Sequence, residues 1–363
     1  MFQVLRIAAA TLDIPLLCQE ARVFSTTESR HSEHSFSGKA NFDISEWMLL
    51  EVLRWFEGRV GNAAVARKIL AHAERQGTAV QDAFMISIDA KKHFGAAVEA
   101  CLLVICLADH SQKPNHDYII FDSLCDDKGR RVGHRGGLIV GDLTTFNECA
   151  FLVGQSPQKW RSGVKHDASA VMEFTHTAHG LKNGFREVVE IESDYLFPLL
   201  KGSDIGSNKG WRGKYVLVTQ RYVGEETASI QNNAPKTWKY LLQHAAQLDA
   251  RGSTIYLKNP RFSIFGVGDY AFRSWRIAIC GLYKALHFRL VEPMDGKPVM
   301  FDDTIYYLSF DTEEAAIDIL EKLNSKAALN LLSSLIFWDE KRPIKTSILN
   351  VLDWSRLVQS IQA

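Results

Sequence analysis

The sequence lacks a cysteine motif, a long apolar run and an excess of charge of either sign, and each absence excludes a class of protein. Its six cysteines form no Cys-x-x-Cys pair, which excludes a zinc ribbon and gives no sign of a disulfide framework. The longest apolar run, residues 100–108, is about half as long as a membrane-spanning helix. Lys+Arg and Asp+Glu both number 42, which excludes a uniformly basic nucleic-acid coat but leaves room for a local basic face.

The amino-terminal segment does not have the pattern of a secretion signal. Residues 1–17 are mildly apolar, but Asp13 and Pro15 interrupt them and no small-residue cleavage site follows. We therefore expect a soluble cytoplasmic protein that has free thiols and no membrane partner.

Turn signals divide the chain into two parts. From residue 109 to residue 141 they dominate the sequence, as in Arg135-Gly136-Gly137, and we place a domain boundary near Ser111. The 363 residues, 46% of them hydrophobic, suffice for one large domain or two ordinary ones.

Hydrophobic periodicity predicts an α/β chain, with helices and strands mixed in α+β fashion along the second part. Helices are expected at residues 43–56, 63–76, 235–251, 312–323, 326–335 and 344–352. Strands are expected at residues 84–89, 99–107, 118–121, 138–140, 215–218, 299–301 and 306–310.

Basic residues concentrate in one segment of the second part. Residues 201–300 hold 15 Lys+Arg and 7 Asp+Glu, interleaved with aromatic residues such as Trp211, Tyr215 and Tyr270. Cations beside aromatic rings suit a polyanion that has stackable bases, that is, DNA or RNA. The alternative is an ordinary aromatic core with solvated lysines at its edge.

Two short stretches are candidates for DNA contact. The stretch 159–166 offers Lys159, Trp160, Arg161, Ser162 and Lys165 around a glycine. Here the alternative is that Trp160 anchors a loop in the core and the charges are solvated.

The second stretch offers Arg273, Trp275 and Arg276. Arg273 and Arg276 lie on one face if the stretch is helical and on opposite faces if it is a strand.

Seven stretches, in order along the chain, resemble one family. They are GKANFDISEWML (38–49), NAAVARKIL (62–70), SIDAKKHFGAAVEACLLV (87–104), SPQKWRSGVKHDASAVMEF (156–174), DYLFPLLKGSDI (194–205), FSIFGVGDYAFRSWRIAICGLYK (262–284) and KPVMFDDTIYYL (297–308). Together they are similar to the C-terminal half of the adenine-N6 DNA methyltransferases of bacterial restriction-modification systems.

The resemblance implies a domain plan. Residues 38–110 would be a partial Rossmann-like remnant of the catalytic domain, which in the family carries S-adenosylmethionine. Residues 111–363 would be a mixed α+β target-recognition domain that binds double-stranded DNA. Residues 1–37 do not resemble the family.

The family's chemical motifs are missing. The Gly-rich cofactor turn and the catalytic Asn/Asp-Pro-Pro-aromatic loop both precede the segment that matches residue 38, and neither occurs in residues 1–37. We also expect a strand to be missing, since Arg59-Val60-Gly61 stands where the family has a short apolar strand. We therefore expect no catalytic and no cofactor-binding residues here, and no S-adenosylmethionine bound by this chain alone.

Two motifs imitate the missing ones. A Gly-x-Gly at Gly266 and Gly268, with Glu292 as the acid, could imitate a cofactor loop, but a tight turn or a close backbone approach is favoured. Residues 259–262 (Asn-Pro-Arg-Phe) imitate the catalytic loop with Arg in place of the second Pro, and a turn that enters a strand is favoured.

Two further patterns bear on metal ions. The histidine pairs at 31/34 and 176/179 have no completing ligand, so no metal site is expected. Asp339-Glu340-Lys341, with Asp302 and Asp303, could form a Mg²⁺-dependent nuclease site, or simply the solvated start of a helix.

Four hypotheses remain. The first is a truncated methyltransferase that retains sequence-directed DNA binding. The second is a stand-alone DNA-specificity subunit that works with a separate catalytic chain. The third is a nuclease and the fourth is a non-functional remnant.

Overall fold

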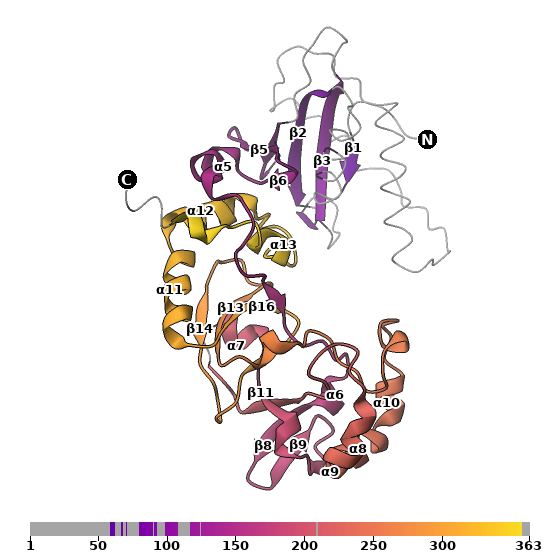
Figure 1. Cartoon of the computed structure of the whole chain (residues 1–363). Helices are drawn as coiled ribbons and strands as arrows, with labels where there is room; N and C mark the ends of the chain where they lie inside the picture. Colours follow the sequence, from indigo (N-terminus) through magenta and orange to yellow (C-terminus); the bar gives the residue numbers. More distant parts are fainter. Residues whose placement is uncertain are drawn as a thin grey trace, which may run out of the picture. The chain divides into compact units, whose positions relative to one another are not determined.

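The computed structural model describes residues 59–61, 67, 70, 80–89, 91–92, 99–107, 117–123, 125–207 and 210–357. Contacts divide the chain into two compact units, Met1–Glu148 and Cys149–Ala363 (Figure 1). The helix expected at 43–56 lies outside the described residues. Of the helix expected at 63–76, Arg67 and Leu70 are described, and both are helical. Among the described helices, none combines the length and the apolarity that a bilayer span requires.

The first unit contains a mixed sheet with the strand order β1-β3-β2-β4-β5-β6. Strands β2 (Val80–Asp89) and β3 (Glu99–Leu107) pair antiparallel along almost their whole length, from Asp89↔Glu99 to Val80↔Leu107. Both were expected from their apolar patterns, and β3 has the predicted bounds. The sequence predicted no strand at Arg59-Val60-Gly61, and this was wrong: these residues form β1 (Arg59–Gly61), which pairs antiparallel with β3. Backbone pairing to a long neighbour makes this strand, although its own side chains give little β signal.

The remaining strands of this sheet follow the turn-rich segment. Strand β4 (Tyr118–Phe121) lies parallel to β2, and it continues through β5 (Arg130–Arg135) into β6 (Leu138–Val140) by antiparallel pairing. The last turn is made by Gly136 and Gly137, both with positive φ, as the sequence predicted. The boundary placed near residue 111 therefore falls between two strands of one sheet, and the contacts divide after Glu148 instead.

The second unit contains two sheets. The first has the order β10-β9-β8-β12-β11-β15, and all its pairs are antiparallel except β11 with β15. Its strands are β8 (Glu173–Thr177), β9 (Gly180–Asn183), β10 (Val188–Val189), β11 (Leu196–Leu200), β12 (Lys214–Leu217) and β15 (Met300–Phe301). Every residue of β11 is buried, so this strand is central to the core.

The second sheet of this unit has the order β14-β13-β16-β7. Its strands are β7 (Arg161–Ser162), β13 (Trp275–Cys280), β14 (Arg289–Val291) and β16 (Ile305–Phe310). Strands β13 and β16 pair antiparallel over six residues, and β16 is buried along its entire length. Apolar side chains that face both ways explain why no strict alternation marks β16 in the sequence.

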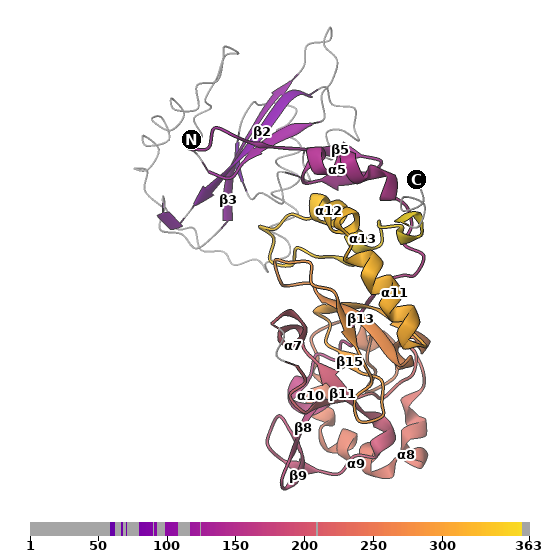
Figure 2. The same ribbon diagram turned by 90° about the vertical axis from the view of Figure 1, so that its left-hand side faces the viewer.

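Helices pack on both sheets of the second unit, as α6 does on β8 and β9 and α11 does on β13 and β16 (Figures 1 and 2). The helices of the described residues are α5 (Leu143–Cys149), α6 (Ser169–Met172), α7 (Gly202–Gly206), α8 (Ile230–Asn233), α9 (Pro235–Gln243), α10 (Ala245–Asp249), α11 (Glu313–Leu323), α12 (Lys326–Leu335) and α13 (Thr346–Leu349). Short 3-10 turns occur at Ala150–Leu152, Ser193–Tyr195, Thr227–Ser229, Tyr256–Lys258, Asp269–Phe272 and Trp354–Leu357.

The expected helices at the C-terminal end are largely confirmed. The side chains of Thr312 and Ser325 cap α11 and α12 by accepting from the amides of Ala315 and Ala328. Helix α13 is shorter than the 344–352 expected. The single helix expected at 235–251 is divided into α9 and α10 at His244, whose side chain bonds the Tyr240 carbonyl and Glu187.

Candidate nucleic-acid interface

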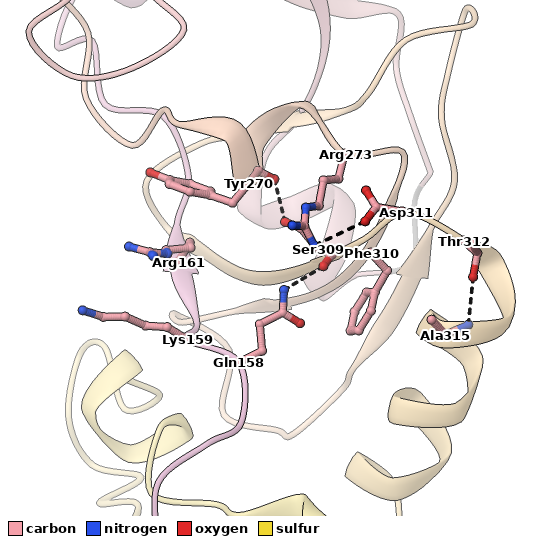
Figure 3. A pocket seen from close by; sticks show the side chains of 10 residues that line it. All are labelled: Gln158, Lys159, Arg161, Tyr270, Arg273, Ser309, Phe310, Asp311, Thr312 and Ala315. Carbon is pink, nitrogen blue, oxygen red and sulfur yellow. Dashed lines mark hydrogen bonds and ion pairs between the residues drawn. The ribbon is translucent and has the colours of Figure 1, made fainter.

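A pocket of about 550 Å³ lies in the second unit, at the side of the sheet that contains β7 and β16 (Figure 3). Three segments that are distant in sequence form its walls. The lining residues are Gln158, Lys159, Arg161, Tyr270, Arg273, Ser309, Phe310, Asp311, Thr312 and Ala315. Both stretches that the sequence nominated for DNA contact therefore supply residues to one site.

The first wall is the extended segment that leads into β7. Trp160 is buried and packs against Phe288 with ring centroids 5.6 Å apart, and its backbone amide donates to Asn350 Oδ1 at 3.0 Å. Side chains alternate along an extended chain, so a buried Trp160 turns its two neighbours outward. Figure 3 shows Lys159 and Arg161 pointing to the same side of the pocket.

The second wall is Tyr270, which lies next to Arg161. The Arg161 guanidinium carbon stands 4.6 Å from the Tyr270 ring centroid, which is cation–π distance. The Tyr270 carbonyl accepts from Ser309 Oγ at 2.7 Å, and Gln158 Nε2 donates to the Ser309 carbonyl at 2.7 Å. Burial raises the pKa of the Tyr270 phenol, so it remains a neutral donor. The two hydrogen bonds tie the three segments together.

The pocket is positively charged. Of its three cations, Arg273 is partly balanced by Asp311, with Nη1 3.6 Å from the carboxylate oxygen. In the described structure, the side chains of Lys159 and Arg161 pair with no carboxylate. Two uncompensated positive charges beside aromatic walls favour an anionic ligand with a planar group.

Two predicted contact residues do not reach the surface. Trp160 is 2% exposed and Arg276 is 0% exposed, so the expectation that they touch DNA is corrected to a place in the core. For Trp160 this agrees with the alternative stated above, that its side chain anchors a loop in the core. Arg276 lies in strand β13, where it pairs with Ser309 of β16 but is covered completely, and burial lowers its pKa to about 10.

Three further predicted residues lie outside the pocket lining. Ser162 Oγ donates to the Asp303 carbonyl at 3.2 Å, and Lys165 Nζ lies 3.2 Å from Asp167. Trp275 is half-buried at the start of β13. These three side chains therefore do not line the pocket, and the predicted contact residues that do line it are Lys159, Arg161 and Arg273.

Several residues of the site were missed from the sequence. No pattern in the sequence marked five of the lining residues as part of a site, because strand pairing across about 150 positions brings them to the pocket. These five are Gln158, Ser309, Phe310, Asp311 and Thr312. The sequence indicated Tyr270 only weakly, as one of the aromatic residues of the basic segment 201–300.

The two motifs that imitate the cofactor loop and the catalytic loop, at residues 266–268 and 259–262, both have structural roles. Gly266 has φ +78°, and a Cβ there would meet the Gly163 carbonyl oxygen at 2.2 Å, so this glycine permits two backbone segments to meet. At residues 259–262, the Ser263 amide donates to the Pro260 carbonyl at 3.1 Å, and the Asn259 side chain is bonded to the Ile255 carbonyl. This is a turn, although no strand follows it.

Two carboxylates of the nuclease hypothesis, those of Asp302 and Glu340, are engaged with different partners. Asp302 accepts from the amides of Gly202 and Thr304, and Glu340 pairs with Lys345. The described part of the chain has no group of three His, Cys, Asp or Glu residues placed to hold a metal ion. His31 and His34 lie outside the described residues, and the exposed His176 ring contacts Tyr215 edge-on.

These features define a mixed α+β protein with a cationic, aromatic-lined pocket. Over 342 residues the chain is 45% identical to the type II methyltransferase M.NspV of Nostoc sp. (strain ATCC 29411 / PCC 7524), a match that covers 92% of this chain and 71% of that protein. The chain therefore belongs to the type II methyltransferases, the DNA methyltransferases of restriction-modification systems. No protein-family model matches it.

A solved structure is also similar. It is the type IIL restriction-modification enzyme MmeI in complex with DNA, with a TM-score of 0.45 and 11% identity. The match covers 81% of this chain and 38% of that one.

Proposed function

We propose that this chain binds double-stranded DNA in a sequence-directed manner, and that Lys159, Arg161 and Arg273 contact the DNA. The observation that carries the proposal is the convergence of these three cations on one pocket with a net positive charge. Phosphate neutralisation by Lys and Arg supplies most of the affinity of DNA-binding proteins. In this proposal the recognition function lies in the second unit, and the methylated base in the family reaction is adenine.

We further propose that these 363 residues do not transfer a methyl group from S-adenosylmethionine on their own. The nine prolines include no Pro-Pro pair, so the sequence contains no Asn/Asp-Pro-Pro-aromatic loop to hold a flipped adenine. A separate catalytic chain would then supply the cofactor and the reaction, and this chain would supply the DNA site.

The first experiment measures binding to mixed duplex DNA over a salt series by fluorescence anisotropy. We expect the logarithm of the affinity to fall linearly with the logarithm of salt concentration, and Lys159→Ala to reduce the slope by about 0.9 if Lys159 neutralises one phosphate. The control is Lys258→Ala, which removes an exposed lysine outside the pocket. A folded protein that does not bind DNA at low salt contradicts the proposal.

The second experiment tests methyl transfer directly. The chain is incubated with duplex DNA and S-adenosylmethionine that carries a labelled methyl group, and the DNA is digested to nucleosides. We expect no labelled N6-methyladenine. Its appearance would show that these residues hold a catalytic site, and would remove the need for a partner chain.

A further inference from the structure

Arg161 differs from Arg261 and Arg251, two other arginines of this unit that stack on aromatic rings. Arg261 lies 4.8 Å from the Phe262 ring, but its guanidinium makes two hydrogen bonds to Asp249, at 2.6 and 3.1 Å. Arg251 lies 3.7 Å from the Tyr256 ring and donates to three backbone carbonyls. Arg161 is stacked on Tyr270 and faces a pocket, and among the described residues no acceptor takes its N–H groups.

The backbone that carries Arg161 is held in place by pairing with strand β16 and by the hydrogen bonds that follow it. Arg161 and Ser162 pair with Tyr307 and Tyr306 of the buried strand β16. The Gly163 and Val164 amides then donate to the carbonyls of Ile305 and Phe301 at 3.0 and 2.7 Å. A stacked side chain on a paired strand is positioned far more narrowly than one on a free loop.

We propose that Arg161 reads a guanine in the DNA site through two parallel hydrogen bonds to the guanine O6 and N7 atoms. A guanidinium presents its donors as a planar fork that matches these two acceptors, and this is the commonest specific contact in the major groove. Tyr270 is the positioning residue, because its ring holds the guanidinium over one face and leaves the N–H edge open. This inference rests on the proposed function.

Lys159 has a different role in the same pocket. It is exposed, and a lysine carries its ammonium group on a long four-carbon stem with no preferred planar partner. A phosphate contact tolerates this freedom, whereas base recognition does not. Lys159 therefore adds affinity on all sequences alike, while Arg161 distinguishes one base pair from another.

The test compares sequence preferences of three proteins. Duplexes bound from a random-sequence pool are sequenced for the unmodified chain, for Arg161→Lys and for the control Arg261→Lys, whose guanidinium also stacks on a ring but is occupied by Asp249. We expect the unmodified chain and Arg261→Lys to select the same site. For Arg161→Lys, the preference for one guanine should fall about tenfold, while the base preferences at the other positions of the site should remain.

A second measurement needs no variant and so does not depend on the folding of one. Each guanine of the site selected by the unmodified chain is replaced in turn by 7-deazaguanine, which lacks the N7 acceptor, and at one of them the affinity of the unmodified chain is expected to fall about tenfold. If Arg161→Lys weakens binding equally on all sequences and 7-deazaguanine has no effect, Arg161 contacts phosphate and the inference is wrong, while the proposed function stands. If the unmodified chain does not bind DNA, the proposed function itself fails.

Discussion

Trp160 packs against Phe288 with ring centroids 5.6 Å apart, and this contact decides which way the neighbouring cations face. Because Trp160 is 2% exposed, its replacement by alanine leaves a large cavity. We expect Trp160→Ala to lower the free energy of unfolding by about 3 kcal/mol or more, measured by urea titration.

The control for this prediction is Trp160→Phe. In the described structure the Trp160 indole N–H has no hydrogen-bond partner, so phenylalanine keeps much of the packing and loses no bond. We expect it to cost less than about 1.5 kcal/mol. Equal stability of Trp160→Ala and the unmodified chain would show that this side chain is not buried in solution.

Arg276 leads to a second prediction, which also separates it from the DNA site. Its side chain is fully buried 5.7 Å from the Tyr307 ring centroid, it donates to the Trp275 carbonyl, and its Nε and Nη2 atoms have no acceptor among the described residues. A buried charge with few partners contributes little net stability. We expect Arg276→Met to melt at the same temperature as the unmodified chain or higher, and to bind DNA equally well.

Arg273→Met provides the comparison. Arg273 is half exposed in the pocket, so its loss should leave the melting temperature unchanged and weaken DNA binding. A strong destabilisation by Arg276→Met, above about 3 kcal/mol, would mean that the buried guanidinium has an ionic partner.

Much of the fold was accessible from the sequence. Strands β3, β4 and β6 and helix α12 have the predicted bounds, because apolar runs bounded by turn residues or caps specify them locally. Strands β1 and β7 were not predicted, since two or three polar or small residues become a strand only by pairing with a longer neighbour.

The site was accessible in part. Lys159, Arg161 and Arg273 were nominated separately from their charge and neighbours. Their meeting in one pocket depends on the pairing of β7 with β16 and on the bond between Ser309 and Tyr270. Such contacts join positions far apart in sequence, and no local pattern encodes them.

Glu173 gives a prediction about pH. Its carboxylate is nearly buried, which raises its pKa, but hydrogen bonds from His166 and Lys201 outweigh this and lower the pKa from 4.5 to about 2. A carboxyl group whose pKa is lowered by folding stabilises the folded state above its unfolded pKa, and this stability is lost as the pH falls through the folded pKa. The loss should therefore occur between about pH 4.5 and pH 2.

The measurement is the unfolding free energy of Glu173→Gln and of the unmodified chain at several pH values. We expect Glu173→Gln to be less stable at pH 6 by on the order of 2 kcal/mol, and the difference to shrink as the pH falls toward 2. Glu190→Gln, which removes an exposed carboxylate paired with Lys236, should show little effect at any pH. A difference for Glu173→Gln that does not depend on pH would exclude the ionic origin.

Gly266 leads to the last prediction, which tests why the Gly-x-Gly is present. Its φ is +78°, and an added Cβ would stand 2.2 Å from the Gly163 carbonyl oxygen, where the segments joined by the Lys165–Phe265 backbone pair meet. Gly213 has a similar φ of +66° with open space around it. We expect Gly213→Ala to cost about 1 kcal/mol for the backbone conformation alone, and Gly266→Ala to cost distinctly more, because backbone must move as well. Urea titration of both variants measures the difference, and equal costs would mean that the two backbones are not in contact in solution.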